Sequence, residues 1–169
     1  MNHKSTKSLS LVSLNCNSIP GKTHHLDCVI RHVSPDMIAL CEKKTEPNHS
    51  WLRNSDRLYY IYRRDKTSAL GGGVLLAVSD HTNLKVTNIY SDPVNEIISL
   101  DLDYHGYTFV FACYYRRPSI KNVSDILDWY ERQINQTYPS LGTPIHLTLT
   151  GSQNHWKQTE TIISCMATF

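Results

Sequence analysis

The chain has 169 residues, a length that holds one domain with its own hydrophobic core and leaves little room for a second. Its 17 basic and 15 acidic residues give a formal charge of +2, so overall charge does not by itself indicate a nucleic-acid partner. The five cysteines form no C-x-x-C pair, and the N-terminus has no apolar signal segment, which together predict an intracellular protein with reduced thiols and no membrane anchor.

The first elements in chain order are predicted to be a strand, a helix and a second strand. Leu9 to Leu14 has the pattern of a strand, and a helix follows in which apolar residues recur at i, i+3, i+4 and i+7: Leu26, Val29, Ile30 and Val33. Pro35 prevents the helix from continuing. Asp36 to Glu42 is a short apolar run that closes on a carboxylate, which indicates a buried strand with Glu42 at its end.

The middle of the chain contains several strand-like runs with polar joins: Leu58 to Arg63, Gly73 to Val78, Leu84 to Tyr90, Glu96 to Leu102 and Thr108 to Tyr115. Because the joins are direct, we expect antiparallel pairing. Tyr104 to Tyr107 has the composition of a hairpin turn, since Gly106 can take the positive φ that such turns require.

A second amphipathic helix is predicted at about Val123 to Tyr138, and a final strand at Ile145 to Thr150. After Gly151 the pattern weakens, and Ile162-Ile163 is the one short apolar stretch. Both helices need a sheet to cover, and there are more strands than a simple alternating βαβ pattern supplies. The elements therefore predict a sandwich of mixed sheets with helices on its outer faces.

Three short motifs suggest chemistry that their context does not support. Pro20-Gly21-Lys22-Thr23 lies between a strand and a helix like a P-loop, but that motif needs glycine where this chain has Cys16. Gly71-Gly72-Gly73 precedes a strand rather than a helix, so a tight entry into the strand is the better interpretation. Ser79-Asp80-His81 lies in a mid-chain connection, where an Asp-His pair is common in ordinary turns.

Two groups of polar side chains leave alternatives open. His25, Cys28 and His32 share one flank of the first helix and could present metal ligands, although a solvated flank accounts better for them. Arg63-Arg64-Asp65-Lys66 and Arg116-Arg117 are basic clusters near tyrosines, suited to the phosphates of a nucleic acid. Solvated loop charge explains these clusters equally well.

Five segments in fixed order resemble one known family: Leu14-Asn15-Cys16-Asn17-Ser18, Pro35 to Glu42, Gly71-Gly72-Gly73-Val74, Tyr115-Arg116-Arg117-Pro118-Ser119 and Leu149-Thr150-Gly151. In order and spacing they resemble the apurinic-endonuclease-like domain of non-LTR (LINE-type) retrotransposons, which belongs to the endonuclease/exonuclease/phosphatase superfamily. The resemblance covers residues 8–156, a partial domain, and leaves residues 157–169 as a tail outside the family pattern.

The resemblance implies a four-layered α/β sandwich, in which two mixed, largely antiparallel sheets are flanked by helices, incomplete at the C-terminus. It also implies an enzyme that nicks one DNA strand with Mg²⁺ or Mn²⁺. A monomer in the nucleus, without a membrane segment and with a reverse transcriptase domain in the parent polyprotein, is the expected setting.

The same resemblance assigns roles to individual residues. Glu42 would be the principal metal ligand with Asn15 beside it, because a hard cation prefers a few oxygen ligands plus water. Tyr115 would contact the scissile phosphate, and Asn154 would orient that phosphate or the attacking water. Taken singly, Glu42 could be a surface carboxylate, Asn15 a turn former and Tyr115 a packed aromatic.

Two departures from the family indicate impaired activity. The Gly-Asp-x-Asn signature is present as Gly151-Ser152-Gln153-Asn154, and Ser152 cannot replace the carboxylate that activates or positions water. Losing such a base typically costs about 10²–10⁴ in rate. The family also closes its domain with a Ser-Asp-His segment that has no counterpart after Asn154, and Ser79-Asp80-His81 stands in the wrong place to supply it.

The sequence therefore leaves competing functions. The first is a DNA endonuclease domain of a non-LTR retrotransposon with impaired catalysis. The second is a non-catalytic nucleic-acid-binding remnant that holds DNA through its basic clusters: Arg63, Arg64, Arg116 and Arg117. A phospholipid or inositol phosphate hydrolase shares the metal chemistry, but the Tyr115-Arg116-Arg117-Pro118 segment disfavours it.

Overall fold

A computed structural model describes residues 9–16, 22–42, 52, 57–65, 73–92, 96–115, 128, 132 and 161–165, and for Glu42, Tyr115 and residues 161–165 it describes the backbone. The elements in chain order are β1 (Leu11–Asn15), α1 (Thr23–Val33), β2 (Met37–Glu42), β3 (Tyr59–Asp65), β4 (Gly73–Ser79), β5 (Lys85–Ser91), β6 (Ile97–Tyr104), β7 (Tyr107–Tyr115) and β8 (Thr161–Cys165). Each strand predicted between Leu9 and Tyr115 is therefore confirmed, with bounds that differ by one or two residues.

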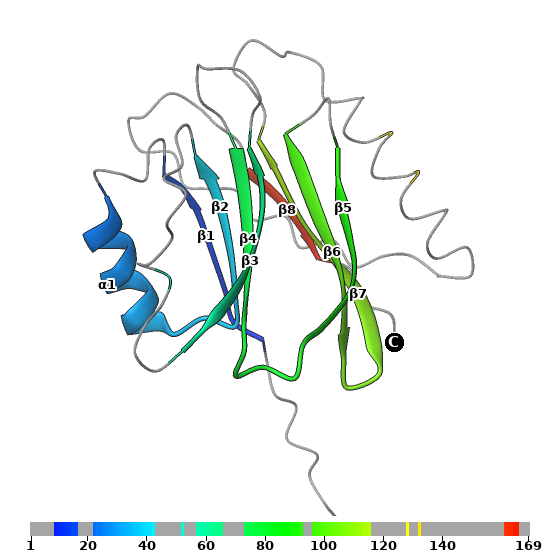
Figure 1. The fold of residues 1–169 in the computed structure, drawn as a ribbon, viewed down its shortest axis with the longest axis horizontal. Coiled ribbons are helices and arrows are strands. Elements are labelled where there is room, and N and C mark those ends of the chain that lie inside the picture. Colours follow the sequence, from blue (N-terminus) through cyan, green and yellow to red (C-terminus); the bar gives the residue numbers. More distant parts are fainter. Residues whose placement is uncertain are drawn as a thin grey trace, which may run out of the picture.

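The strands form two sheets that face each other (Figure 1). The first has the order β1-β2-β4-β3 and the second the order β5-β6-β7-β8. β1 and β2 are parallel and are connected through α1, whereas every other pair among the described strands is antiparallel. The predicted α/β sandwich of largely antiparallel sheets is confirmed.

The hairpin between β6 and β7 has the predicted two-residue turn. Tyr104 pairs with Tyr107, and the two residues between them both have positive φ, 53° at His105 and 84° at Gly106. This backbone matches the right-handed twist of the flanking strands. The Gly106 amide also donates to Asp103 Oδ1 at 3.2 Å, which stabilises the turn from its first strand.

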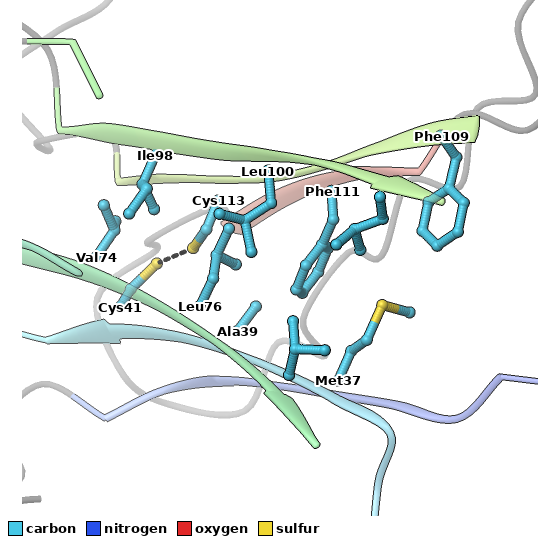
Figure 2. Packing of buried hydrophobic residues seen from close by; sticks show 12 residues of the cluster. Met37, Ala39, Cys41, Val74, Leu76, Ile98, Leu100, Phe109, Phe111 and Cys113 are labelled. Atoms are coloured by element: carbon cyan, nitrogen blue, oxygen red, sulfur yellow. Dashed lines mark hydrogen bonds between the residues drawn. The ribbon is translucent and has the colours of Figure 1, made fainter. Parts of the chain in front are cut away.

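The main core lies between the two sheets (Figure 2). Alternate residues of β2 and β4 meet alternate residues of β6 and β7 there, as expected when one face of each strand is buried. The fully buried members include Ala39, Cys41, Leu76, Leu100 and Phe111. Packing across this interface holds the strand ends of one sheet against those of the other.

Helix α1 covers the outer face of the first sheet. Leu26 and Ile30 are buried against β2 and β4, while Val29 and Val33 are 39% and 47% exposed, so the predicted four-residue stripe is only half buried. The reason is position: the two valines lie at the margin of the contact with the sheet. Ser34 ends the helix in the left-handed conformation, with φ of 48°.

Two later predictions lie largely outside the described residues. Of the predicted second helix, the structure describes Asp128 and Arg132, which are helical, with Arg132 Nε donating to the Asp128 carbonyl oxygen at 3.0 Å. The predicted strand Ile145 to Thr150 is wholly outside them. β8, which the sequence did not predict, lies in the expected tail and pairs with β7, with Ile163 opposite Cys113. The domain boundary at residue 156 stays a prediction.

Candidate functional site

The ends of β1 and β2 bring two predicted site residues to one edge of the first sheet. Asn15 is the last residue of β1 and Glu42 the last of β2, and because these strands are parallel, both ends lie together. Asn15 is paired with Cys41, directly before Glu42, and the Cys16 amide donates to the Cys41 carbonyl oxygen at 2.8 Å. Asn15 is an exposed residue at this edge.

The second sheet contributes the end of β7 to the same place. The Sγ atoms of Cys41 and Cys113 lie 3.7 Å apart across the core, and Cys41 Sγ donates to the Tyr114 carbonyl oxygen at 3.7 Å (Figure 2). Tyr115, the last residue of β7, therefore lies at the same end of the sandwich as Glu42, on the facing sheet. Asn15, Glu42 and Tyr115, which are distant in sequence, end three strands at one end of the sandwich. We call this the strand-end site.

Gly73 begins β4 at the strand-end site. It pairs with Glu42 on one side and with Asp65 on the other, so both acidic residues flank it. A Cβ at Gly73 would lie 3.1 Å from the Arg64 carbonyl oxygen, closer than side chains normally approach a backbone. This close approach of β3 and β4 supports the predicted tight entry into a strand.

Lys22 adds a positive charge at the strand-end site, although the sequence analysis gave it no role. Its Nζ donates to the Cys16 carbonyl oxygen at 2.6 Å, next to Asn15 in the chain. Lys22 itself is exposed and directly precedes α1. In the sequence, Lys22 stands out only as the lysine of the P-loop-like stretch. That stretch was not interpreted as a phosphate site because the motif fails at Cys16.

The predicted basic residues of β3 do not form a single patch. Arg63 and Arg64 are neighbours in a strand, so their side chains lie on opposite faces of the sheet. The Arg63 guanidinium donates to Asp65 Oδ1 through Nε at 3.0 Å and Nη2 at 2.5 Å. Arg116 and Arg117 lie outside the described residues.

Glu96 is a second residue that the sequence analysis did not select. It is 8% exposed and stands directly before β6, where Ile97 pairs with Tyr114, so Glu96 is level with Tyr115 in the hairpin. In the sequence, Glu96 could have been noticed as the carboxylate at the start of the predicted strand Glu96 to Leu102. A buried carboxylate is unfavourable without compensating interactions, so we expect opposite charge or hydrogen-bond donors around Glu96.

The buried Cys113 thiol beneath the strand-end site is held in the protonated form. The hydrogen bond with Cys41, together with burial, raises the pKa of Cys113 well above its ordinary value. A protonated thiol is a poor nucleophile and a poor metal ligand. The cysteines therefore support the site by packing, and the oxygen-bearing side chains at its surface are the groups suited to chemistry.

Two other sequence motifs lie away from the strand-end site. Ser79-Asp80-His81 begins at the last residue of β4, at the opposite end of the sandwich, where Asp80 Oδ1 accepts from the Leu58 amide at 3.1 Å and so fixes the start of β3. On α1, Cys28 Sγ lies 4.0 Å from His24 Nε2. Within the described ranges, no three His, Cys, Asp or Glu side chains are grouped as metal ligands.

The remaining predicted site residues, Ser152 and Asn154, are outside the part of the chain that the structure describes. In that part there is also no helix both long and apolar enough to span a membrane. The donor set at the strand-end site, an amide beside the position of a carboxylate, consists of hard oxygen ligands, which suit Mg²⁺ or Mn²⁺ rather than a thiolate-binding metal.

Comparison with known proteins shows the fold. No family model matches the chain, and no curated protein matches it. TDP2 from C. elegans has a similar structure, with a TM-score of 0.55 and 14% identity over 78% of this chain and 44% of that one. An AP endonuclease from Archaeoglobus fulgidus gives a TM-score of 0.48 and 18% identity over 80% of this chain and 53% of that one. The chain therefore spans only about half of the length of each of these proteins. The likeness to TDP2 shows the endonuclease/exonuclease/phosphatase fold.

Proposed function

We propose that this chain is a metal-dependent phosphodiesterase domain that nicks DNA, of the kind carried by non-LTR retrotransposons. The observation that supports the proposal is that β1, β2 and β7 end at one end of the sandwich, so that the backbones of Asn15, Glu42 and Tyr115 lie at the strand-end site. These are the three residues in the described ranges to which the family resemblance assigned catalytic roles. In the same proposal the chain is a nuclear monomer joined to a reverse transcriptase domain.

Glu42 and Asn15 would hold Mg²⁺ or Mn²⁺, with water completing the coordination. The bound ion would polarise the phosphate and make a bound water more acidic. One carboxylate and one amide are a small ligand set, but Mg²⁺ usually keeps several waters and takes only one or two carboxylates. The exposure of Asn15 is compatible with such a partly hydrated ion.

The other proposed residues act on the phosphates of the substrate. The Tyr115 hydroxyl would donate to a non-bridging oxygen of the scissile phosphate, and Asn154 would orient the same phosphate or the attacking water. Arg116 and Arg117, which follow β7 directly in the chain, would contact flanking phosphates. The Lys22 ammonium favours the approach of a polyanion from the same end.

Ser152 leaves this proposed machinery without a carboxylate base. A serine hydroxyl accepts a proton poorly and does not steer water electrostatically, so catalysis should be slower by about 10²–10⁴ than with aspartate. This residue favours a second candidate function, a domain that binds nucleic acid without cutting it. Both functions use the same basic residues. The nuclease needs Glu42 to form a nicked product, whereas the binding domain forms no product.

A nicking assay on supercoiled plasmid separates the two functions. For the nuclease we expect slow conversion to open circles with Mg²⁺, loss of that conversion with EDTA, and its abolition by Glu42→Ala. Asp101→Asn is the matched control, because Asp101 lies on β6 and accepts a hydrogen bond from Asn88. Salt-sensitive plasmid binding with no nicking would support the binding domain instead. Nicking that survives Glu42→Ala would contradict the proposed site.

A further inference from the structure

Glu96 is the only buried acidic side chain among those that the structure describes. It directly precedes β6 and is 8% exposed, so its side chain is buried at the start of that strand, where Ile98 is two residues further on. Ile98 is 2% exposed and belongs to the core between the sheets. Figure 2 shows Ile98 and Val74 beside the Cys41 and Cys113 pair, at the end that leads to the strand-end site.

Arg64 occupies the matching position on the first sheet. It shares a face of β3 with Tyr62, which packs against the core between the sheets, and it pairs in register with Val74 of β4. β6, the strand that Glu96 precedes, packs across the interface against both β3 and β4. The fold thus brings a guanidinium and a buried carboxylate to facing positions at the same end of the molecule.

The face of the sheet distinguishes Arg64 from its neighbour. The Arg63 guanidinium is held by Asp65 on the opposite face of the sheet, so its charge is partly compensated there. Burying a carboxylate is unfavourable unless an opposite charge and hydrogen bonds compensate it. Arg64 is the arginine of the pair that the topology directs toward Glu96. An arginine has five N–H donors and can serve a carboxylate and a phosphate together.

We propose that Glu96 is a positioning residue that holds the Arg64 guanidinium at the mouth of the strand-end site, and that Arg64, rather than Arg63, binds a phosphate of the DNA backbone. The role toward DNA rests on the proposed function, whereas the pairing of Glu96 with Arg64 does not. Glu96 then acts through Arg64 and needs no contact with the substrate.

The pairing is tested first without nucleic acid, by thermal unfolding of Glu96→Gln, Arg64→Gln and the double variant. Arg64→Gln should lower the Tm because it removes the positive charge proposed to compensate a buried carboxylate, and adding Glu96→Gln should recover part of that loss. The matched control is the ion pair on the other face of the sheet, tested with Arg63→Gln, Asp65→Asn and their double variant. If the losses from Glu96→Gln and Arg64→Gln simply add, the pairing is wrong.

The phosphate role is tested by fluorescence anisotropy with a DNA duplex in EDTA, where cutting is suppressed. Arg64→Gln should weaken binding by about tenfold and reduce the slope of log affinity against log salt by about one, whereas Arg63→Gln should change neither by that much. Glu96→Gln should also weaken binding. If Glu96 only repelled phosphate, its removal would strengthen binding, which would overturn the proposal.

The two measurements separate this inference from the proposed function. Coupled unfolding without any DNA binding would support the pair of Glu96 and Arg64 and overturn its role toward DNA. Nicking that depends on Glu42, together with additive unfolding of the two variants, would support the nuclease and overturn the pair. Arg64→Lys provides a further check, because lysine keeps the charge but lacks the planar fork needed to serve two anions.

Discussion

The Sγ atoms of Cys41 and Cys113 lie 3.7 Å apart between the two sheets, and each cysteine stands one or two residues before a strand end of the proposed site. The contact of the two thiols in the core therefore lies directly beneath the ends of β2 and β7. Because the side chains at this contact are small, the sheets can approach closely at the end where the strand-end site lies.

Enlarging one of these cysteines should separate the sheets. Cys113→Leu adds volume to a fully buried position, and we expect it to lower the free energy of unfolding by about 1–3 kcal/mol. Cys28→Leu is the control, since Cys28 is exposed on α1 and should change stability by less than about 0.5 kcal/mol. Urea unfolding of both variants provides the measurement, and equal effects would show that the contact is loosely packed.

Stability should fall as the solution becomes alkaline. The pKa of Cys113 is raised above its ordinary value of 9.0, first by its hydrogen bond with Cys41 and then by burial. Above that ordinary value the unfolded thiol loses its proton while the folded thiol keeps it, so the unfolded state binds fewer protons and stability decreases with rising pH. The contribution of the thiol is fully present below the unfolded pKa and is lost as pH rises toward the folded pKa.

Urea unfolding at pH values on either side of 9.0 measures this effect. The unfolding midpoint should drop more for the unmodified chain than for Cys113→Ala, which lacks the thiol. Burial also raises the pKa of Tyr59 above 10.0, so a further loss at higher pH should remain in both proteins. A midpoint that rises with pH across this window would contradict the assignment.

The turn at His105 and Gly106 offers a test of the hairpin alone. A Cβ at Gly106 would meet no atom within 4 Å, so Gly106→Ala introduces no clash and its cost comes from the positive φ of 84°. We expect a loss of about 1–2 kcal/mol. His105→Gly should be neutral or slightly stabilising because His105 also has positive φ. Thermal unfolding of the two variants compares them, and an unchanged Gly106→Ala would show that the turn adopts another backbone.

Local sequence signals were sufficient for the elements up to Tyr115. Hydrophobic periodicity located β1 to β7, and Gly106 located the turn, because each depends on residues near one another in the chain. The half-exposed Val29 and Val33 show the limit of this method: an apolar spacing predicts which side of a helix is favoured, whereas the width of its contact depends on the partner sheet.

The position of a candidate residue was predictable where that residue ends a strand. Asn15, Glu42 and Tyr115 were selected by family order, and the structure places the three backbones at one end of the sandwich. Glu96 and Lys22 were missed because their positions depend on pairing across the hairpin and on a contact with the Cys16 carbonyl oxygen, which single-sequence patterns do not encode. β8 was missed because its five residues have a short apolar run without turn signals.

The most direct test of the proposed nuclease is restoration of the carboxylate at Ser152. We predict that Ser152→Asp increases the rate of Mg²⁺-dependent plasmid nicking by about 10²–10⁴. In that background Glu42→Ala should abolish the gain, while Asp101→Asn should leave it intact. If Ser152→Asp gives no additional nicking, or if the gain persists when Glu42 is replaced, the strand-end site is not a phosphodiesterase site of the proposed kind.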